Sequence, residues 1–244
     1  PFPALVGVYG KPTAVNNVET LCNVPSIVMK GTQWYSGLGP EKNGGPKLSC
    51  VSGHVKRPGV FEASMHVTLR ELIDDYAGGV RDGRTLKAVI PGGSSVPILM
   101  PDQLDTQASF DAIQKAGSLL GSAAIVVLDD TTCMVWLAEN LLHFYRHESC
   151  GKCTPCREGT DWLHKILMRI ERGDGQMSDL DLLSSISGNV AGKTLCAFGD
   201  AAAPPVLTTL KPFRHEYEPH ITEAPCTLPP PWRAPPPAGP TQHG

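Results

Sequence analysis

Three cysteines stand close together in the second half of the chain. Cys150, Cys153 and Cys156 are separated by two residues each, within the stretch Glu-Ser-Cys-Gly-Lys-Cys-Thr-Pro-Cys-Arg-Glu-Gly at 148–159. The C-x-x-C-x-x-C spacing, completed by a remote fourth cysteine, is typical of one cuboidal iron-sulfur cluster. Structural zinc prefers two separated C-x-x-C pairs, and the sequence has no second pair. The spacing therefore favours an iron-sulfur cluster over zinc, and electron transfer as the chemistry.

The fourth ligand has three candidates. Cys133 precedes the motif by about four helical turns, roughly 25 Å at the helical rise per residue, which is too far for the same cluster. Cys226 lies in a proline-rich tail. Cys196 lies in a loop between two predicted helices, and an antiparallel bundle returns that loop to the cluster end. We therefore expect four metal ligands: Cys150, Cys153, Cys156 and Cys196.

The residues beside the cysteines suit an anionic cluster. Gly151 and Gly159 are expected to let the backbone approach it closely. Lys152 and Arg157 are expected to supply positive charge, which favours the reduced cluster. The alternative for each cation is an ordinary surface side chain.

Amphipathic helices flank the motif. Apolar residues at helical spacing predict one helix over 132–147, ending where the cysteines begin, and a second from 159 to 173 with Trp162 on its apolar face. A third is predicted over 178–188, and a fourth after Cys196 that runs to about residue 217. Together they predict a four-helix bundle.

A small mixed unit precedes the bundle. Alternating residues predict a hairpin over 47–62, a capped helix over 68–77 and a strand over 86–90, an order that resembles a ubiquitin-like β-grasp unit. A continuous apolar run over 123–128 predicts a further, buried strand.

The first segment is irregular and then helical. Residues 1–12 are rich in Gly and Pro, and a helix is predicted to run to about Lys30, where Gly31 ends it. Asn16 and Asn17 stand at its entrance. Two amide side chains there either hold a polar ligand or serve as an N-cap and turn.

These elements predict an α+β fold without a catalytic residue of its own. The predicted segments are 1–45, the end of a cofactor-binding domain; 46–105, the β-grasp domain; 106–130, a connecting segment and buried strand; 131–218, the helical bundle with the cluster; and 219–244, a proline-rich tail that is disordered or extended.

Composition excludes several classes of protein. The 244 residues carry a formal net charge of -3 and no long basic run, which argues against a nucleic-acid surface. The sequence has no apolar run of about 18 residues, so no membrane span is predicted, and its start has no signal-peptide pattern. Eight cysteines, three of them clustered, suit a metal in a reducing cytosol better than a disulfide scaffold.

The chain resembles a known family at several motifs. The segment 148–159, Cys196, Asn-Asn-Val-Glu-Thr at 16–20 and Pro-Gly-Gly-Ser-Ser at 91–95 are similar to the NADH-binding flavoprotein subunit of respiratory complex I, the F-type subunit of NADH-quinone oxidoreductase. The likeness extends in order from residue 1 to about 218.

The resemblance implies cofactors and a direction of electron flow. Within that family the four cysteines match the ligands of a [4Fe-4S] cluster that takes electrons from FMN. Asn16 and Asn17 match residues of the FMN pocket, and Phe2 matches an aromatic beside the NADH site. The implied reaction is hydride transfer from NADH to FMN, followed by single-electron transfer to the cluster and onward to quinone.

One departure limits what this stretch is expected to do alone. The family begins with a flavin- and NADH-binding domain that has a glycine-rich loop and an acidic Gly-Glu-Glu stretch, and neither occurs in this sequence. The chain resembles the C-terminal portion only. We expect it to bind iron but no flavin, and to be inactive without the missing half.

The resemblance also implies partners and a place in the cell. These are the missing flavin-domain half and other subunits of the complex I peripheral arm, especially a small [2Fe-2S] subunit and a large multi-cluster iron-sulfur subunit. The complex would hold the chain on the cytoplasmic face of the membrane, without insertion. Alternatives are the diaphorase subunit of an NAD-dependent hydrogenase or formate dehydrogenase and, in another class, a zinc-stabilised interaction module.

Overall fold

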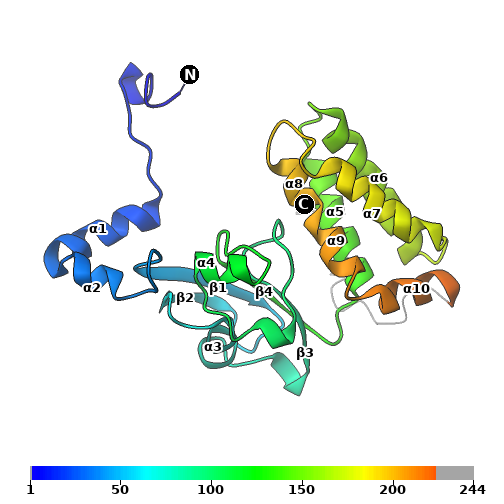
Figure 1. The fold of residues 1–244 in the computed structure, drawn as a ribbon, viewed down its shortest axis with the longest axis horizontal. Coiled ribbons are helices and arrows are strands. Elements are labelled where there is room, and N and C mark those ends of the chain that lie inside the picture. The colour runs from blue at the N-terminus through cyan, green and yellow to red at the C-terminus, as the bar shows by residue number, and fades with distance from the viewer. Residues whose placement is uncertain (1, 224–244) are drawn as a thin grey trace, which may run out of the picture.

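The chain folds into a small sheet unit and a helical unit, with an N-terminal segment that projects from the sheet (Figure 1). The structure is a computed structural model and describes residues 2–223. The fold is a mixed one in which a small sheet accompanies many helices. No helix in this part of the chain combines the length and the apolar character that crossing a membrane requires.

The N-terminal segment carries a short 3-10 turn, Val8–Gly10, and then helices α1 (Val18–Lys30) and α2 (Thr32–Ser36). Gly31 separates the two helices with a φ of +87°, a left-handed value that favours glycine, so the predicted end of the first helix is confirmed. None of the α1 residues is buried.

Four strands form one sheet in the order β2-β1-β4-β3. The hairpin of β1 (Pro46–Gly53) and β2 (Gly59–Ser64) is antiparallel, as predicted. β4 (Ala124–Asp129) lies between β1 and β3 (Leu86–Ile90), parallel to β1 and antiparallel to β3. The buried strand predicted from the apolar run over 123–128 is therefore confirmed, and it is a central strand of the same sheet.

Short helical pieces pack against the sheet. Thr68 and Glu71 form the predicted capping box at α3 (Leu69–Glu71). The expected helix then changes to a π-helical turn, in which the Ala77 backbone N–H donates to the Leu72 carbonyl five residues back. The remaining pieces are 3-10 turns at Arg81–Gly83 and Pro101–Gln103, and α4 (Phe110–Lys115).

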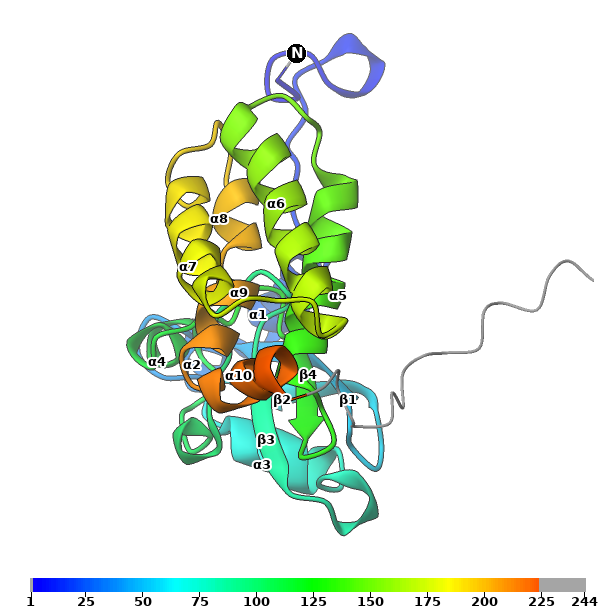
Figure 2. The same cartoon turned by 90° about the vertical axis from the view of Figure 1, so that its right-hand side faces the viewer.

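The helical unit is built on three long helices, α5 (Met134–Glu148), α6 (Thr154–Glu171) and α7 (Ser178–Val190) (Figure 2). The single fourth helix expected after Cys196 is wrong. Three short helices replace it: α8 (Phe198–Ala202), α9 (Pro204–Leu210) and α10 (Arg214–Thr222). Two prolines open α9, where their missing N–H groups cost least.

The expected start of the tail at residue 219 also differs from the structure. Pro219 lies inside α10, which continues to Thr222 and forgoes the one backbone hydrogen bond that Pro219 cannot donate. The Glu223 backbone N–H still donates to the Pro219 carbonyl at 2.9 Å. The rest of the predicted tail, including Cys226, lies outside the described residues.

The core of the helical unit comes from the predicted apolar faces. Leu142, Leu163 and Leu167 are fully buried. Trp162, predicted on the same face of its helix, is instead 51% exposed. Tyr217 is completely buried, and its hydroxyl lies 2.8 Å from the Thr209 hydroxyl.

Sheet and helical unit pack directly on each other. A third apolar cluster joins Ile90 and Leu128 of the sheet to Met134 of α5. Beside it, the Lys87 ammonium makes an ion pair of 2.5 Å with Glu216 of α10. The helices that carry the cysteines are therefore fixed against the sheet.

A buried carboxylate ties α6 to α7. Asp179 is 3% exposed; both its oxygens contact the Arg169 guanidinium, and one also accepts the Gln176 backbone N–H at 2.8 Å. In Arg169→Met the carboxylate stays buried with one partner fewer, so we expect a loss of about 1–3 kcal/mol in the free energy of unfolding, measured by urea titration. Lys165→Met, which removes only an exposed pair with Asp161, should cost less than about 0.5 kcal/mol. Equal effects would contradict the assignment.

Candidate iron-sulfur site

The cysteine motif begins where α5 ends and continues into α6. Cys150 lies in the turn after Glu148, Cys153 is the N-cap of α6, and Cys156 lies in the first turn of that helix. Cys150 is exposed, Cys153 half-buried and Cys156 buried. The motif therefore presents two of its thiols at the N-terminus of a helix, where the partial positive charge favours anionic groups.

Cys196 belongs to a loop separate from the cysteine motif. It lies in the loop between α7 and α8, and it is exposed. That loop is held by a hydrogen bond from the Thr194 hydroxyl to the Cys196 carbonyl, 2.7 Å, and by one from the Gly192 backbone N–H to Asp200, 2.5 Å.

A close helix contact brings this loop to the motif. A Cβ added at Gly159 of α6 would lie 2.3 Å from Cγ2 of Val190, the last residue of α7. Gly159 therefore serves the close approach of two helices, a role that the sequence did not predict.

The four predicted thiols lie close enough to influence one another. Burial is the largest cause that raises the pKa of the Cys156 thiol, and the nearby thiols of Cys153, Cys150 and Cys196 raise this pKa further. The Ser149 hydroxyl, 3.3 Å from Cys156 Sγ, opposes them. A set of thiolates that repel one another is stabilised by a shared cation, so the donor set fits a bound metal centre.

The spacing suits a cluster better than one zinc ion. Thiolates on a tetrahedral zinc lie about 3.8 Å apart, given Zn–S distances of about 2.3 Å. Among residues 2–223, the group whose ligand atoms all lie within 4.8 Å of one another is Cys133, Glu171 and His220, and no three of the four cysteines converge so tightly. A cuboidal cluster holds its thiolates farther apart than a single ion does.

The neighbouring cation Arg157 has a structural role in the cysteine turn. The Arg157 guanidinium donates to the Gly151 carbonyl at 2.9 Å and to Glu158 at 2.8 Å. It therefore stabilises the turn that carries Cys150, with its charge partly balanced by Glu158. Gly151 adopts a φ of +73°, so this turn favours glycine.

The two asparagines lie on the projecting segment, at the start of α1. Asn17 is its N-cap: its Oδ1 accepts the backbone N–H groups of Glu19 at 2.8 Å and Thr20 at 3.4 Å. It also lines two hollows of about 790 and 550 Å³ between α1 and the sheet. Asn16 is exposed.

Glu19 fixes this helix to the sheet. Its carboxylate accepts the Leu48 backbone N–H at 2.7 Å and pairs with the Lys47 ammonium of β1. Partial burial acts to raise the pKa of Glu19, but these two partners outweigh it and lower the pKa. The Asn17 cap is therefore positioned by β1.

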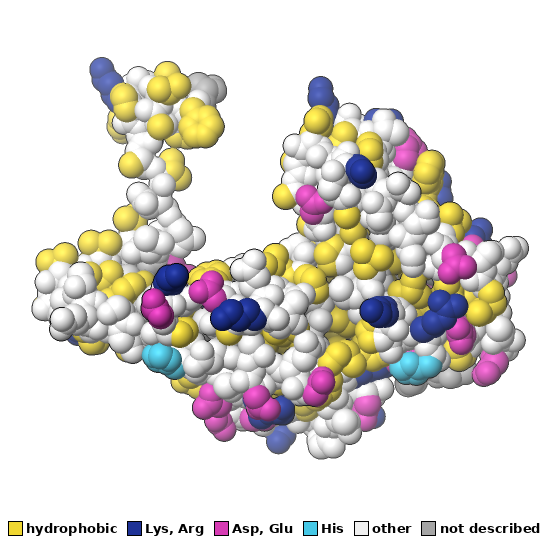
Figure 3. Space-filling view, in the orientation of Figure 1, with side chains coloured by type: hydrophobic (Ala, Val, Ile, Leu, Met, Phe, Trp, Pro, Cys, Tyr) yellow, Lys and Arg dark blue, Asp and Glu magenta, His cyan; other side chains and the backbone are white. Residues whose placement is uncertain are grey.

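Phe2 lies near the end of the projecting segment and is 76% exposed. The space-filling view shows an open concavity between this segment and the helical unit (Figure 3). Phe2 and the asparagines thus stand on one arm of the molecule, and the cysteines belong to the other.

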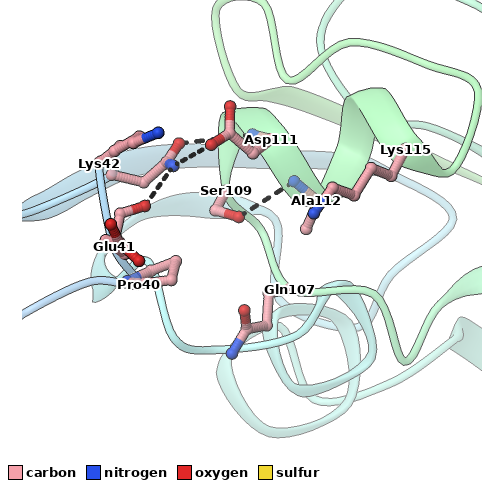
Figure 4. A pocket seen from close by; sticks show the side chains of 9 residues that line it. Pro40, Glu41, Lys42, Gln107, Ser109, Asp111, Ala112 and Lys115 are labelled. Atoms are coloured by element: carbon pink, nitrogen blue, oxygen red, sulfur yellow. Dashed lines mark hydrogen bonds between the residues drawn. The ribbon is translucent and has the colours of Figure 1, made fainter.

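A further pocket, of about 370 Å³, lies between the loop at 40–43 and α4 (Figure 4). Its polar groups serve the local structure: the Asn43 amide donates to Asp111 at 3.0 Å and to the Glu41 carbonyl at 3.2 Å. None of the predicted site residues lines it.

One group of ligand-type side chains does not emerge from the sequence patterns. Cys133, Glu171 and His220 meet where α5 begins, α6 ends and α10 passes. From the sequence, Cys133 is a candidate only for the fourth ligand of the iron-sulfur cluster. No local spacing pattern connects three residues on three different helices, so the sequence carries no signal for the group.

Two family descriptions match the chain. Residues 136–220, which contain all four predicted ligands, match the NADH-ubiquinone oxidoreductase-F iron-sulfur binding region. Residues 47–127, which contain the whole four-stranded sheet except its margins, match the SLBB domain.

Similar proteins share these regions. The chain is 52% identical over 226 residues to the F 2 subunit of NADH-quinone oxidoreductase from Rhizobium meliloti (strain 1021), covering 93% of this chain and 54% of that protein. It is 50% identical over 230 residues to the F subunit of NADH-quinone oxidoreductase from Mycobacterium tuberculosis (strain ATCC 25618 / H37Rv), covering 94% and 52%. The chain thus spans about half the length of the curated relatives it matches.

Solved structures with a similar fold are also known. A chain of an NAD+-reducing [NiFe]-hydrogenase in the air-oxidized state superposes with a TM-score of 0.77 at 35% identity, covering 91% of this chain and 38% of that one. The H2-reduced state gives 0.79 at 34% identity. With the iron-sulfur binding region in place and half of its residues shared with named relatives, the chain belongs to the family of NADH-quinone oxidoreductase F subunits.

Proposed function

We propose that this chain is the electron-transfer part of an NADH-quinone oxidoreductase F subunit. Cys150, Cys153, Cys156 and Cys196 hold a [4Fe-4S] cluster, which when bound accepts single electrons from NADH-reduced FMN and passes them towards quinone. The thiols of Cys150, Cys153 and Cys196 lie near that of Cys156, and this grouping of side chains from two separate segments supports the proposal most directly.

The residues around the cysteines tune the site. Cys153 and Cys156 lie at the N-cap and in the first turn of α6, where the partial positive charge of the helix N-terminus favours the added negative charge of the reduced state. The Ser149 hydroxyl, beside Cys156, also accepts the Gly151 backbone N–H at 3.4 Å, so it links the turn to the ligand.

The flavin side of the reaction rests on fewer residues. Asn16 and Asn17 contribute to an FMN pocket, and Phe2 lies beside the NADH site. Because Asn17 Oδ1 is committed to the α1 cap, its amide N–H2 group is the part that can donate to the flavin. The hollows beside Asn17 support this placement.

We also propose that the sheet unit is a β-grasp unit and that the helical unit is a four-helix bundle. The hairpin, the parallel β1–β4 pair and the capped helical turn support a β-grasp unit, and α5, α6, α7 and the broken α8–α9 support a four-helix bundle. Segment 1–45 belongs with the flavin domain, 46–105 forms the β-grasp unit, 106–130 connects it to the helices and contributes β4, and the unit that carries the cluster begins at 131 and includes α10, past the predicted end at 218.

The partners and location follow from the family. They are the flavin-domain half, a small [2Fe-2S] subunit and a large multi-cluster iron-sulfur subunit in the peripheral arm of complex I, on the cytoplasmic face of the membrane. The hydrogenase likeness favours a second candidate, the diaphorase subunit of an NAD-dependent hydrogenase. The identity of the copurifying subunits separates the two.

Elemental analysis and low-temperature EPR test the proposal. We expect the 244-residue polypeptide, after anaerobic reconstitution with iron and sulfide, to bind about four irons and to give a reduced-cluster signal with dithionite. As a control, Cys22→Ser, which changes an exposed cysteine on α1, should leave both results unchanged. Zinc at the four cysteines, without iron or signal, would reject the proposal in favour of a zinc-stabilised interaction module.

A further inference from the structure

Three ligand-type side chains meet at the end of the helical unit away from the cysteine motif. The triad consists of Cys133, the N-cap of α5; the half-buried Glu171, the last residue of α6; and His220 of α10. Cys133 is 4% exposed and His220 is 8% exposed. The 15 residues of α5, about 22 Å of helix, separate the triad from the motif.

The imidazole of His220 is oriented for a metal. Its Nδ1 lies 2.6 Å from the Glu216 carbonyl, and because a carbonyl oxygen can only accept, Nδ1 carries the proton. In the neutral ring the lone pair is then on Nε2, which faces the other two members of the triad. A histidine metal ligand is commonly held in its tautomer by such a backbone carbonyl.

The distances match a tetrahedral ion. His220 Nε2 lies 3.4 Å from Cys133 Sγ and 3.6 Å from Glu171 Oε2, and all three ligand atoms lie within 4.8 Å of one another. Sulfur, nitrogen and oxygen at zinc distances of about 2.0–2.3 Å occupy tetrahedral corners roughly 3.4–3.6 Å apart. The two distances from His220 Nε2 therefore match those between ligands of one ion, and the third pair of atoms lies within 4.8 Å.

The charges also favour a divalent cation. A thiolate and a carboxylate together balance Zn²⁺, so the occupied site is neutral, which lowers the cost of its burial. The Trp136 backbone N–H donates to Cys133 Sγ at 3.4 Å, and the α5 N-terminus favours the thiolate. One sulfur, one imidazole and one carboxylate form a mixed donor set that suits Zn²⁺.

We propose that Cys133, Glu171 and His220 bind one structural Zn²⁺, with water at the fourth corner. The ion fastens the start of α5 and the end of α6 to α10, the last helix described. It is distinct from the iron-sulfur cluster and does not depend on it.

Metal counting and zinc K-edge X-ray absorption test this site in the iron-loaded chain. We expect about one zinc per chain beyond the iron, with one sulfur at about 2.3 Å and the other ligands nitrogen or oxygen at about 2.0–2.2 Å. Cys133→Ser and His220→Asn should lose the zinc but keep the iron and its EPR signal. Four sulfur ligands, or no zinc beyond the iron, would overturn the proposal.

Two further variants separate ligand loss from misfolding. Serine is itself a good N-cap, so Cys133→Ser keeps the start of α5 intact. Glu171→Gln keeps the side-chain shape and removes its charge, and we expect the zinc affinity, measured against a competing chelator, to fall at least roughly tenfold. Cys22→Ser, on α1, should keep the zinc. Unchanged zinc binding in Glu171→Gln together with Cys133→Ser would also overturn the assignment.

Discussion

Cys156→Ser is expected to abolish the iron-sulfur cluster. Cys156 is the buried member of the four thiols, it lies in the first turn of α6, and its pKa shows the influence of the other three. A serine oxygen replaces a soft thiolate with a harder donor, and the remaining three cysteines cannot fill the fourth corner. Iron per chain and the dithionite-reduced EPR signal should both fall to the background of the metal-free chain.

Matched controls make the loss specific. Cys50→Ser changes an exposed cysteine on β1, and Cys133→Ser changes the buried cysteine at the far end of α5. Both should keep about four irons. If Cys133→Ser lost the iron and Cys156→Ser kept it, the ligand set would be wrong, and with it the conclusion that Cys133 is too distant.

The local parts of this site were predictable and the long-range parts only partly so. The three-residue spacing of the cysteine motif is a local signal, and in the structure the thiols of Cys150 and Cys153 lie near that of Cys156. Choosing Cys196 needed the topology of the bundle. The choice of Cys196 stays a prediction; the structure places its thiol near that of Cys156, although the helix expected after Cys196 is broken into three.

The errors have local physical causes. Helix α6 begins at Thr154, inside the motif, because Pro155 suits a first helical turn, so Cys156 is helical although the helix was predicted to begin only at residue 159. Trp162 has the spacing of the apolar residues of α6 but lies at the edge of the apolar face, where it is exposed. Periodicity alone does not show how wide the buried face of a helix is. The central position of β4 depends on pairing with strands far away in sequence, which the pattern of a single strand cannot show.

The contact between α6 and α7 at Gly159 positions the loop that contains Cys196, so a larger side chain at Gly159 is expected to have a large effect. Gly159→Val would place side-chain atoms where Val190 Cγ2 now lies, 2.3 Å from the position of an added Cβ, with Ile186 Cγ2 3.9 Å from the same position. Overpacking of this kind costs about 1–3 kcal/mol or more. We expect a lower urea midpoint for the metal-free chain.

The same change should reach the cluster through the chain that follows Val190. The loop at 191–197 leads directly from α7 to Cys196, so a shift of the end of α7 moves the fourth ligand while the three ligands of the motif stay on α6. Gly159→Val should therefore lose most of its iron, although no ligand is changed.

A compensating variant decides whether this contact is the cause. Gly159→Val combined with Val190→Ala returns volume to the same space, and we expect it to regain iron and most of the lost stability, a coupling that a double-mutant cycle measures. Gly188→Ala on α7 is the control, because nothing lies within 4 Å of its added Cβ, and it should gain about 0.5–1 kcal/mol from helix propensity. If Gly159→Val bound four irons with an unchanged midpoint, α6 and α7 would not approach as the structure has them, and the position of Cys196 would need another explanation.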